Sequence, residues 1–178
     1  MSEITFKRKF YDEMLEWKMN SNGKSALMID GARRVGKSTI AEVYAKNEYD
    51  DYLLIDFVNA SKDIKDNFDN LGNMDVFFRN LFLFAGQGLK SSNSVIIFDE
   101  VQKFPRAREA IKYLVKDGRY HYIETGSLIS IKKKSQEIVI PSEEDKRKMY
   151  PMDFEEFLWA TGDNVTAPFI KDCFEKRI

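Results

Sequence analysis

Cysteine, net charge and long apolar runs are scarce in this sequence of 178 residues, and each scarcity excludes a class of protein. The single cysteine, Cys173, rules out an internal disulfide and fits a reducing compartment. The formal charge is −1, so no net field draws the chain to nucleic acid or to an anionic membrane. No apolar run approaches the ~20 residues of a membrane span, and residues 1–19 lack the apolar segment of a secretion signal. We therefore expect a cytoplasmic protein with no membrane partner.

Apolar residues, by contrast, are plentiful. At 43% of the chain they suffice for one domain with a proper core. We expect a single domain over 1–178, with an amphipathic N-terminal helix over 5–19 and a core over about 24–160. The helix is predicted from apolar residues that recur at three- and four-residue steps, namely Phe6, Phe10, Met14 and Trp17.

The most informative stretch is GARRVGKST, which comprises Gly31, Ala32, Arg33, Arg34, Val35, Gly36, Lys37, Ser38 and Thr39. It has the pattern G-x-x-x-x-G-K-S of a phosphate-binding loop. In such a loop Gly31 and Gly36 allow backbone angles that a side chain would forbid, which turns successive N–H groups toward the phosphates. Lys37 supplies a point charge for the β- and γ-phosphates, and the Ser38 hydroxyl is placed to ligate Mg²⁺.

The neighbours of this loop are those that a nucleotide site requires. The apolar run 26–30 predicts a buried parallel strand, and the segment from Lys37 predicts a helix that ends near Asn47. The positive N-terminal end of that helix acts on the same anion. The alternative is a glycine-rich turn with a solvated lysine, and the context favours a nucleotide site.

A second informative stretch is SVIIFDE, residues 94–100, in which an apolar strand ends in two carboxylates. In P-loop NTPases the aspartate at this place, here Asp99, holds the Mg²⁺ shell opposite the loop serine. Glu100 is then placed to orient and deprotonate an attacking water as a general base. Because the pair follows a phosphate loop, this function is favoured over two solvated acids at a strand end.

A further strand with a polar end is predicted over 120–127, YHYIETGS. Thr125 and Ser127 emerge where they could contact the γ-phosphate or the lytic water. His121, the only histidine, lies at the start of the strand and far from that edge, so we interpret it as structural.

The remaining segments before residue 117 are interpreted as scaffold. A strand is predicted over 52–57, with helices over 61–68 (capped by Ser61), 74–85 and 102–116. The 74–85 helix should be mostly buried through its apolar residues, Phe77, Phe78, Leu81, Phe82 and Phe84. The cations of the 102–116 helix, Arg106, Arg108 and Lys112, should face solvent.

Residues 131–149 are rich in lysine and glutamate, and two interpretations of them stay open. An exposed mixed-charge loop with a short strand over 137–140 is favoured, and a DNA-contacting loop is the alternative. The next segment, 150–159, predicts a helix capped near Asp153.

Strand, loop and helix followed by further strand and helix units predict an α/β fold. We expect a three-layer α/β/α P-loop NTPase with a mostly parallel central sheet and right-handed crossovers. The glutamate beside the metal-site aspartate argues for hydrolysis by an activated water. The sequence has no N-K-x-D or T-K-x-D segment of the kind that reads guanine, so adenine is preferred and the expected ligands are ATP and Mg²⁺.

Together, the segments GARRVGKST, SVIIFDEVQKFP, YIETGSL and KMYPMDFEEFL resemble the bacterial and archaeal AAA-type ATPases that usually carry a C-terminal domain of unknown function. The resemblance spans residues 31–158 and implies an extra strand between the loop strand and the acidic strand. It assigns ATP and Mg²⁺ binding to the loop, metal and hydrolytic roles to Asp99 and Glu100, and a sensor role to Thr125, with Ser127 as second choice. Arg147 lies where relatives often have an arginine, so a role in trans at a neighbour's phosphate is a hypothesis.

Members of this family are generally longer. We therefore expect this chain to be the ATPase core without the helical lid and the C-terminal domain, and to work with further copies or a C-terminal partner domain. The leading interpretation is an ATP hydrolase whose cycle drives a conformational change in an attached or partner module. Two alternatives stay open: a nucleotide-dependent interaction module with little turnover, and a DNA-associated ATPase.

Overall fold

Five parallel strands form the central sheet of the computed structural model, which describes residues 6–127 and 141–177. They are β1 (Ala26–Gly31), β2 (Asp51–Asp56), β3 (Ser94–Asp99), β4 (His121–Ser127) and β5 (Glu144–Met149). Their order across the sheet is β2-β3-β4-β1-β5, and every neighbouring pair is parallel. As the resemblance implies, β4 lies between the strand that leads into the phosphate loop and the strand that ends in Asp99.

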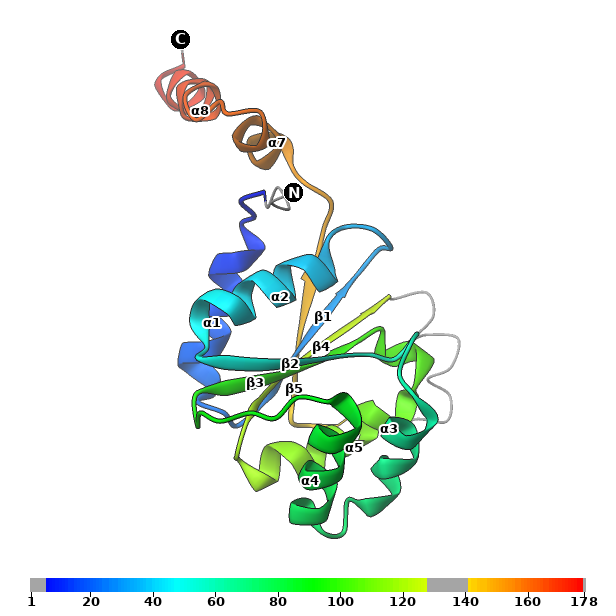
Figure 1. Cartoon of the computed structure of the whole chain (residues 1–178). Coiled ribbons are helices and arrows are strands. Elements are labelled where there is room, and N and C mark those ends of the chain that lie inside the picture. Colours follow the sequence, from blue (N-terminus) through cyan, green and yellow to red (C-terminus); the bar gives the residue numbers. More distant parts are fainter. Residues whose placement is uncertain (1–5, 128–140, 178) are drawn as a thin grey trace.

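Helices cover both faces of this sheet (Figure 1). On one face lie α1 (Phe10–Ser21) and α2 (Lys37–Glu48), and on the other lie α3 (Lys62–Asn67), α4 (Met74–Ala85) and α5 (Pro105–Asp117). Short 3₁₀ helices, η1 (Phe68–Asn70) and η2 (Val101–Lys103), precede α4 and α5. After β5, α7 (Phe154–Ala160) and α8 (Thr166–Lys176) extend away from the sheet. None of these described helices is long and apolar enough to cross a membrane. The predicted three-layer fold is confirmed.

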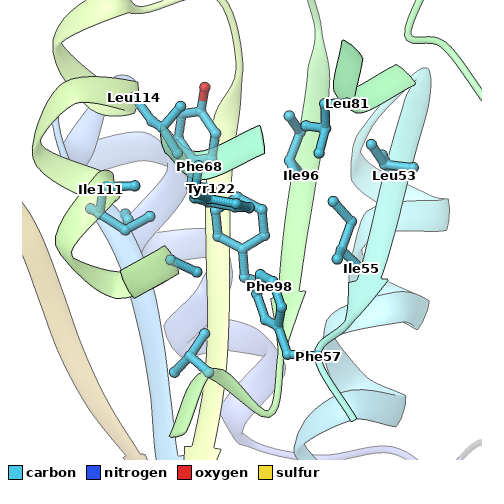
Figure 2. Close-up of a cluster of buried hydrophobic side chains, with 14 of the residues drawn as sticks. Leu53, Ile55, Phe57, Phe68, Leu81, Ile96, Phe98, Ile111, Leu114 and Tyr122 are labelled. Atoms are coloured by element: carbon cyan, nitrogen blue, oxygen red, sulfur yellow. The ribbon is translucent and has the colours of Figure 1, made fainter. Parts of the chain in front are cut away.

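Each face of the sheet has its own apolar core. Every residue of β1 and β3 is buried, because helices cover a parallel sheet on both sides. On the α3–α5 face, Figure 2 shows Phe57, Phe68 and Phe98 packed with aliphatic residues of β2, β3 and α5. On the other face, Met14 and Trp17 of α1 pack against α2 and the central strands. The two cores pack against both faces of β1, the strand whose C-terminal end leads into the phosphate loop.

Most predicted elements are present, some with different ends. α4 has the predicted bounds, and Ser61 caps α3 by accepting a backbone hydrogen bond at 3.3 Å. The predicted N-terminal helix is wrong at its start, because α1 begins at Phe10 rather than at residue 5. The residues just before it are engaged elsewhere: the side chain of Arg8 and the backbone of Lys9 both bind Glu156.

The prediction that α4 is mostly buried is correct for only part of the helix. Phe77, Phe78 and Leu81 are buried, but Phe84 is 40% exposed. The helical repeat places Phe84 on the same face as Phe77 and Leu81, but it lies in the last turn of α4, just before the C-terminal cap of the helix at Gly86, and is less covered there.

Residues 144–149 require the largest correction, because they form β5 rather than part of an exposed loop. The strand pairs with β1 along its whole length. Its charged side chains are accommodated by ion pairs on both faces of the sheet, Lys146 with Asp30 at 2.9 Å and Arg147 with Glu16 at 3.2 Å. The predicted strand over 137–140 and the lysine cluster 132–134 lie outside the described residues.

The prediction that Arg108 faces solvent is also wrong. Its side chain is buried against β5, where it pairs with Glu144, whereas Arg106 is exposed as predicted. Arg108 precedes Ile111 by three residues and Val115 by seven, so the helical repeat places it on the core face of α5. A buried carboxylate compensates its charge there.

Candidate nucleotide site

The phosphate loop joins the C-terminal end of β1 to the N-terminus of α2. Gly36 has a φ of 97°, in the left-handed region that favours glycine. Gly31 is required for a different reason than the one predicted, because a Cβ there would collide with the carbonyl oxygen of Met149 on β5. Arg34 also has a positive φ, 64°, which is costly for a residue with a side chain. Around these turns Ala32, Arg33, Arg34 and Thr39 are exposed, and Val35 is half-buried.

The side chain of Lys37 lies inside the loop. It is buried, and its Nζ donates to the carbonyl oxygen of Ala32 at 2.8 Å and to that of Gly31 at 3.4 Å. The loop therefore encloses one positive charge, and the hydrogen-bond partners of its Nζ in the described part of the chain are neutral carbonyl groups. A phosphate entering the loop would be a stronger partner for it, because hydrogen bonds between charged groups are the strong ones.

Three side chains predicted to act together converge beside this lysine. Ser38 at the start of α2 donates from its hydroxyl to Oδ1 of Asp99 at 2.6 Å. Thr125 of β4 donates to the same carboxylate oxygen, and its hydroxyl accepts a hydrogen bond from the backbone N–H of Glu100 at 3.2 Å. Side chains from α2, β3 and β4 thus meet at Asp99.

Sequence reasoning did not identify Gln102, which contacts the predicted general base. Its amide Nε2 donates to Oε2 of Glu100, and its Oε1 accepts from the backbone N–H of Ser127 at 3.4 Å. Gln102 is buried on η2, directly after the two acids. The DEVQ spacing was the only signal in the sequence, and it does not reveal which side chain the amide contacts.

A cavity of about 560 Å³ opens beside the phosphate loop. It is bounded by the phosphate loop and α2, by the first turn of α1 and the segment before it, and by Met152 after β5. Its apolar lining residues are Phe6, Val35, Ile40, Val43 and Met152, and its charged ones are Lys7, Arg8, Asp12 and Arg34. The sequence did not predict this cavity, because the segments that line it are far apart along the chain.

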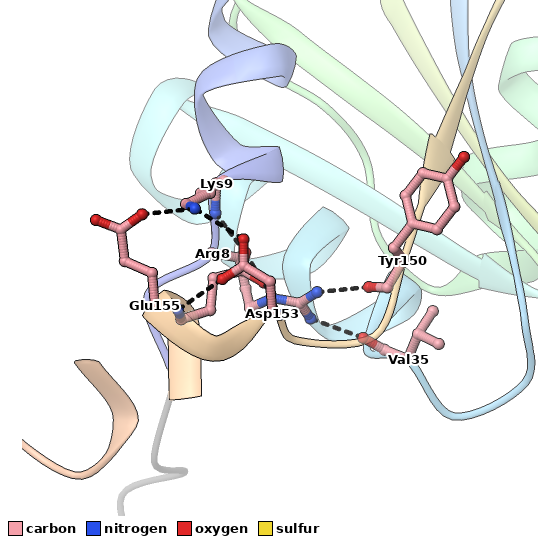
Figure 3. A network of polar contacts seen from close by, with 7 residues as sticks. Arg8, Lys9, Val35, Tyr150, Asp153 and Glu155 are labelled. Atoms are coloured by element: carbon pink, nitrogen blue, oxygen red, sulfur yellow. Dashed lines mark hydrogen bonds and ion pairs between the residues drawn. The ribbon is translucent and has the colours of Figure 1, made fainter. Parts of the chain in front are cut away.

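Arg8 joins the loop to the C-terminal helices (Figure 3). Its guanidinium donates to the carbonyl oxygen of Val35 at 2.8 Å, to that of Tyr150 at 2.7 Å, and to Oε1 of Glu156 at 3.2 Å. Glu156 also forms the capping box of α7 with Asp153, which caps that helix as predicted. Arg8 therefore links the carbonyl group of Val35, in the phosphate loop, to Glu156 in the first turn of α7.

Two singled-out side chains lie away from this site. Arg147 on β5 faces α1, where its Nη1 donates to the carbonyl oxygen of Glu13 at 2.7 Å, and its role in trans stays a prediction. His121 at the start of β4 shares a hydrogen bond of 2.8 Å with the hydroxyl of Tyr49. Burial, with a smaller contribution from the charge of Lys18, lowers the pKa of His121, in keeping with a neutral structural residue.

Comparisons with known proteins agree with this fold. A family model described as "AAA domain" matches residues 23–158, whereas none of the curated proteins matches the chain. Solved structures with a similar fold include two that cover most of this chain. One is the Drosophila ORC bound to AT-rich DNA and Cdc6, with a TM-score of 0.52, 12% identity, and coverage of 83% of this chain and 57% of that chain. The other is a STAND protein with a tetratricopeptide repeat sensor from Pyrococcus horikoshii, with a TM-score of 0.51, 16% identity, and coverage of 96% and 28%.

At such identities the two structures show the fold alone, and this chain spans 57% of one and 28% of the other. The family model carries the assignment, because its match includes the phosphate loop, Asp99, Glu100 and the capping box of α7. The chain belongs to the AAA domain family and contains a nucleotide-binding core of the P-loop ATPase type.

Proposed function

We propose that this domain binds ATP with Mg²⁺ in the phosphate loop and hydrolyses it, with Glu100 as the general base. The observation that carries the proposal is the convergence of Ser38 and Thr125 on one carboxylate oxygen of Asp99. Side chains from α2, β3 and β4 are gathered at one point, and the next residue, Glu100, is a carboxylate that the amide of Gln102 contacts through one oxygen, Oε2.

The residues present fit a Mg²⁺ ion. A serine hydroxyl and an aspartate carboxylate are hard oxygen donors, and Mg²⁺ usually takes one or two protein oxygens and completes its shell with water and phosphate. In the described part of the chain no group of three or more acidic, histidine or cysteine side chains could hold a metal alone, which agrees with a site shared with a phosphate ligand. When bound, Mg²⁺ would neutralise charge on the β- and γ-phosphates. Ser38 and Asp99 would hold it.

The reaction then follows from the placement of the chain's own groups. Lys37 would exchange the carbonyl oxygens of Ala32 and Gly31 for phosphate oxygens. Glu100 would accept a proton from water while the water oxygen bonds to the γ-phosphorus and the bond from that phosphorus to the β–γ bridging oxygen breaks, releasing ADP and phosphate. Thr125 touches both Asp99 and the backbone of Glu100, which supports a role in sensing the γ-phosphate.

The base is assigned to the cavity beside Gly36. Ile40, Val43 and Met152 offer an apolar lining to a purine ring. Asp12, the carboxylate in this lining, can accept a hydrogen bond from the amino group of a purine. The preference for ATP over GTP rests on the sequence, which has no N-K-x-D or T-K-x-D segment to read guanine.

The output of the cycle is assigned to α7 and α8. Arg8 connects the loop to α7, and the two helices expose Phe157, Phe169 and Phe174, which suits contact with an attached or partner module. A role in DNA binding has less support, because Lys146 and Arg147 are paired with acids of this chain.

The test is steady-state phosphate release from ATP and Mg²⁺, measured over a range of protein concentrations. Glu100→Gln should abolish release but keep ATP bound, and Glu109→Gln, an exposed carboxylate of α5, should retain wild-type release. Release that rises faster than linearly with protein concentration would indicate assembly. Binding without turnover in the wild type, seen as stabilisation of the fold by ATP, would point to an interaction module instead. If the wild type shows no ATP binding and no turnover, the nucleotide site is refuted.

A further inference from the structure

We propose that Gln102 is a positioning residue that fixes the carboxylate of Glu100 and ties it to the end of β4. The proposal rests on the proposed function, in which Glu100 is the general base. It goes further by naming a group, outside the loop and the acidic pair, that decides where the base points.

The backbone at Glu100 explains why its side chain needs support. The residue has a φ of 56°, left-handed and costly for a glutamate. Its N–H is held by Thr125 at 3.2 Å, so the backbone is fixed from one side. The long side chain still has several rotatable bonds, and the amide of Gln102 is the described side chain that binds its carboxylate.

Gln102 is itself held in place. It is only 6% exposed on η2, and its Oε1 accepts from the N–H of Ser127 at 3.4 Å. One end of the amide therefore contacts the general base, and the other end contacts the last residue of β4. Thr125 on the same strand binds the backbone N–H of Glu100, so a shift of this strand end on nucleotide binding would reach Glu100 both through Thr125 and through Gln102.

The size of the expected effect follows from the geometry of proton transfer. A general base misplaced by about 1 Å can cost roughly 100-fold in rate without any loss of substrate binding. Within the described structure the side chain of Gln102 forms no hydrogen bond with a residue of the phosphate loop. Its loss should therefore lower kcat and leave KM for ATP nearly unchanged.

The first experiment compares Gln102→Met, Gln102→Glu and wild type in steady-state ATP hydrolysis. Methionine keeps the length of the side chain without hydrogen bonding, and glutamate keeps an acceptor for Ser127 but loses the donor to Glu100. Both should lower kcat roughly 10- to 100-fold and change KM less than about twofold. The matched control is Gln87→Met, which removes an exposed amide bound to the carbonyl of Tyr52 at 2.7 Å, and it should keep wild-type rates. Wild-type kcat in Gln102→Glu, or a rise in KM that accounts for the whole loss, would overturn the proposal.

The second experiment needs no turnover and does not depend on how the Gln102 variants fold. The side-chain amide signals of Gln102 are followed by NMR in wild type and in Glu100→Ala. They should move in Glu100→Ala and stay in place in Glu109→Ala. Unmoved signals would overturn the contact. If wild type does not hydrolyse ATP while these signals move, the contact stands and it is the hydrolytic function that fails.

Discussion

Arg108 and Glu144 form a bidentate ion pair in the interior of the protein. Nε of Arg108 donates to Oε1 at 2.6 Å and Nη2 donates to Oε2 at 2.5 Å, and the two side chains are 3% and 1% exposed. The pair joins α5 to β5, the edge strand whose pairing with β1 also places Met149 against Gly31 of the phosphate loop. A buried charge pair thus holds the strand next to the nucleotide site.

Removing one partner of this pair should destabilise the protein strongly. We expect Arg108→Met to lower the free energy of unfolding by about 3–5 kcal/mol, because Glu144 would stay buried without a partner. Arg106→Met is the control: its ion pair with Asp69 is more than half exposed, so its loss should cost no more than about 1 kcal/mol. Urea unfolding of the three proteins measures both values, and equal losses would contradict the importance of burial.

Glu124 should make stability depend on pH. Its carboxylate on β4 is fully buried, and neither oxygen has a hydrogen-bond partner in the described structure. Burial, and next the charge of Glu144, raise the pKa of Glu124 well above 4.5, while Arg108 acts in the opposite direction. Since the folded pKa lies above the unfolded one, the contribution of Glu124 to stability is complete below the unfolded pKa. It is lost as pH rises through the folded value.

The variant Glu124→Gln mimics the protonated carboxyl and should remove this loss. We expect wild type to lose stability relative to Glu124→Gln as pH rises from about 5 to about 8. Urea unfolding at several pH values gives the comparison. Glu109→Gln, a change of an exposed carboxylate, should parallel wild type over the same range. Parallel curves for wild type and Glu124→Gln would show that Glu124 is ionised throughout.

The arrangement of the main residues of the candidate nucleotide site was predictable, because they lie in short motifs. A strand followed by G-x-x-x-x-G-K-S specifies its own geometry, and parallel strands bring Asp99 and Thr125 to the same sheet edge. The fold followed from the same units. The burial of Arg108 was predictable in principle, because the helical repeat places it on the same face as Ile111. Its charge led to the prediction that it faces solvent.

The other features could not be predicted because they depend on contacts between distant parts of the chain. Nothing in the local sequence indicates a strand over 144–149. The strand tolerates its charges because Lys146 pairs with Asp30 and Arg147 with Glu16, and both acids are distant in the sequence. The contact of Arg8 with Glu156 joins positions 148 residues apart. Gln102 stands beside the motif, yet its role depends on where Ser127 ends β4.

Lys37 should be essential for nucleotide binding. Lys37→Ala removes the positive charge that the loop encloses, and a hydrogen bond to a charged group is worth about 1.5–3 kcal/mol. We therefore expect ATP affinity to fall roughly 10- to 100-fold, as measured by calorimetry with Mg²⁺ present. Lys46→Ala on the same helix, where Lys46 is exposed and pairs with Glu42, is the control and should bind ATP like wild type. Equal affinities in all three proteins would place the phosphates elsewhere.

Arg8 should couple the phosphate loop to α7. Arg8→Ala leaves the carbonyl oxygens of Val35 and Tyr150 without this donor and Glu156 without its ion pair. A buried group left without a partner costs about 1–3 kcal/mol, so the loop should lose order and ATP affinity should fall about tenfold. Amide hydrogen exchange over residues 154–160 should also become faster.

The control for this prediction is Lys9→Ala. Lys9 contacts the start of α7 through ion pairs with Asp153 and Glu155, but these are exposed, and among the described residues it forms no hydrogen bond or ion pair with the loop. Its loss should change exchange in α7 slightly and leave ATP affinity unchanged, because exposed pairs contribute little. If Arg8→Ala speeds exchange in α7 while ATP binds as in wild type, the loop and the helix are held independently. Faster exchange together with weaker binding would identify Arg8 as the residue through which the nucleotide acts on the C-terminal helices.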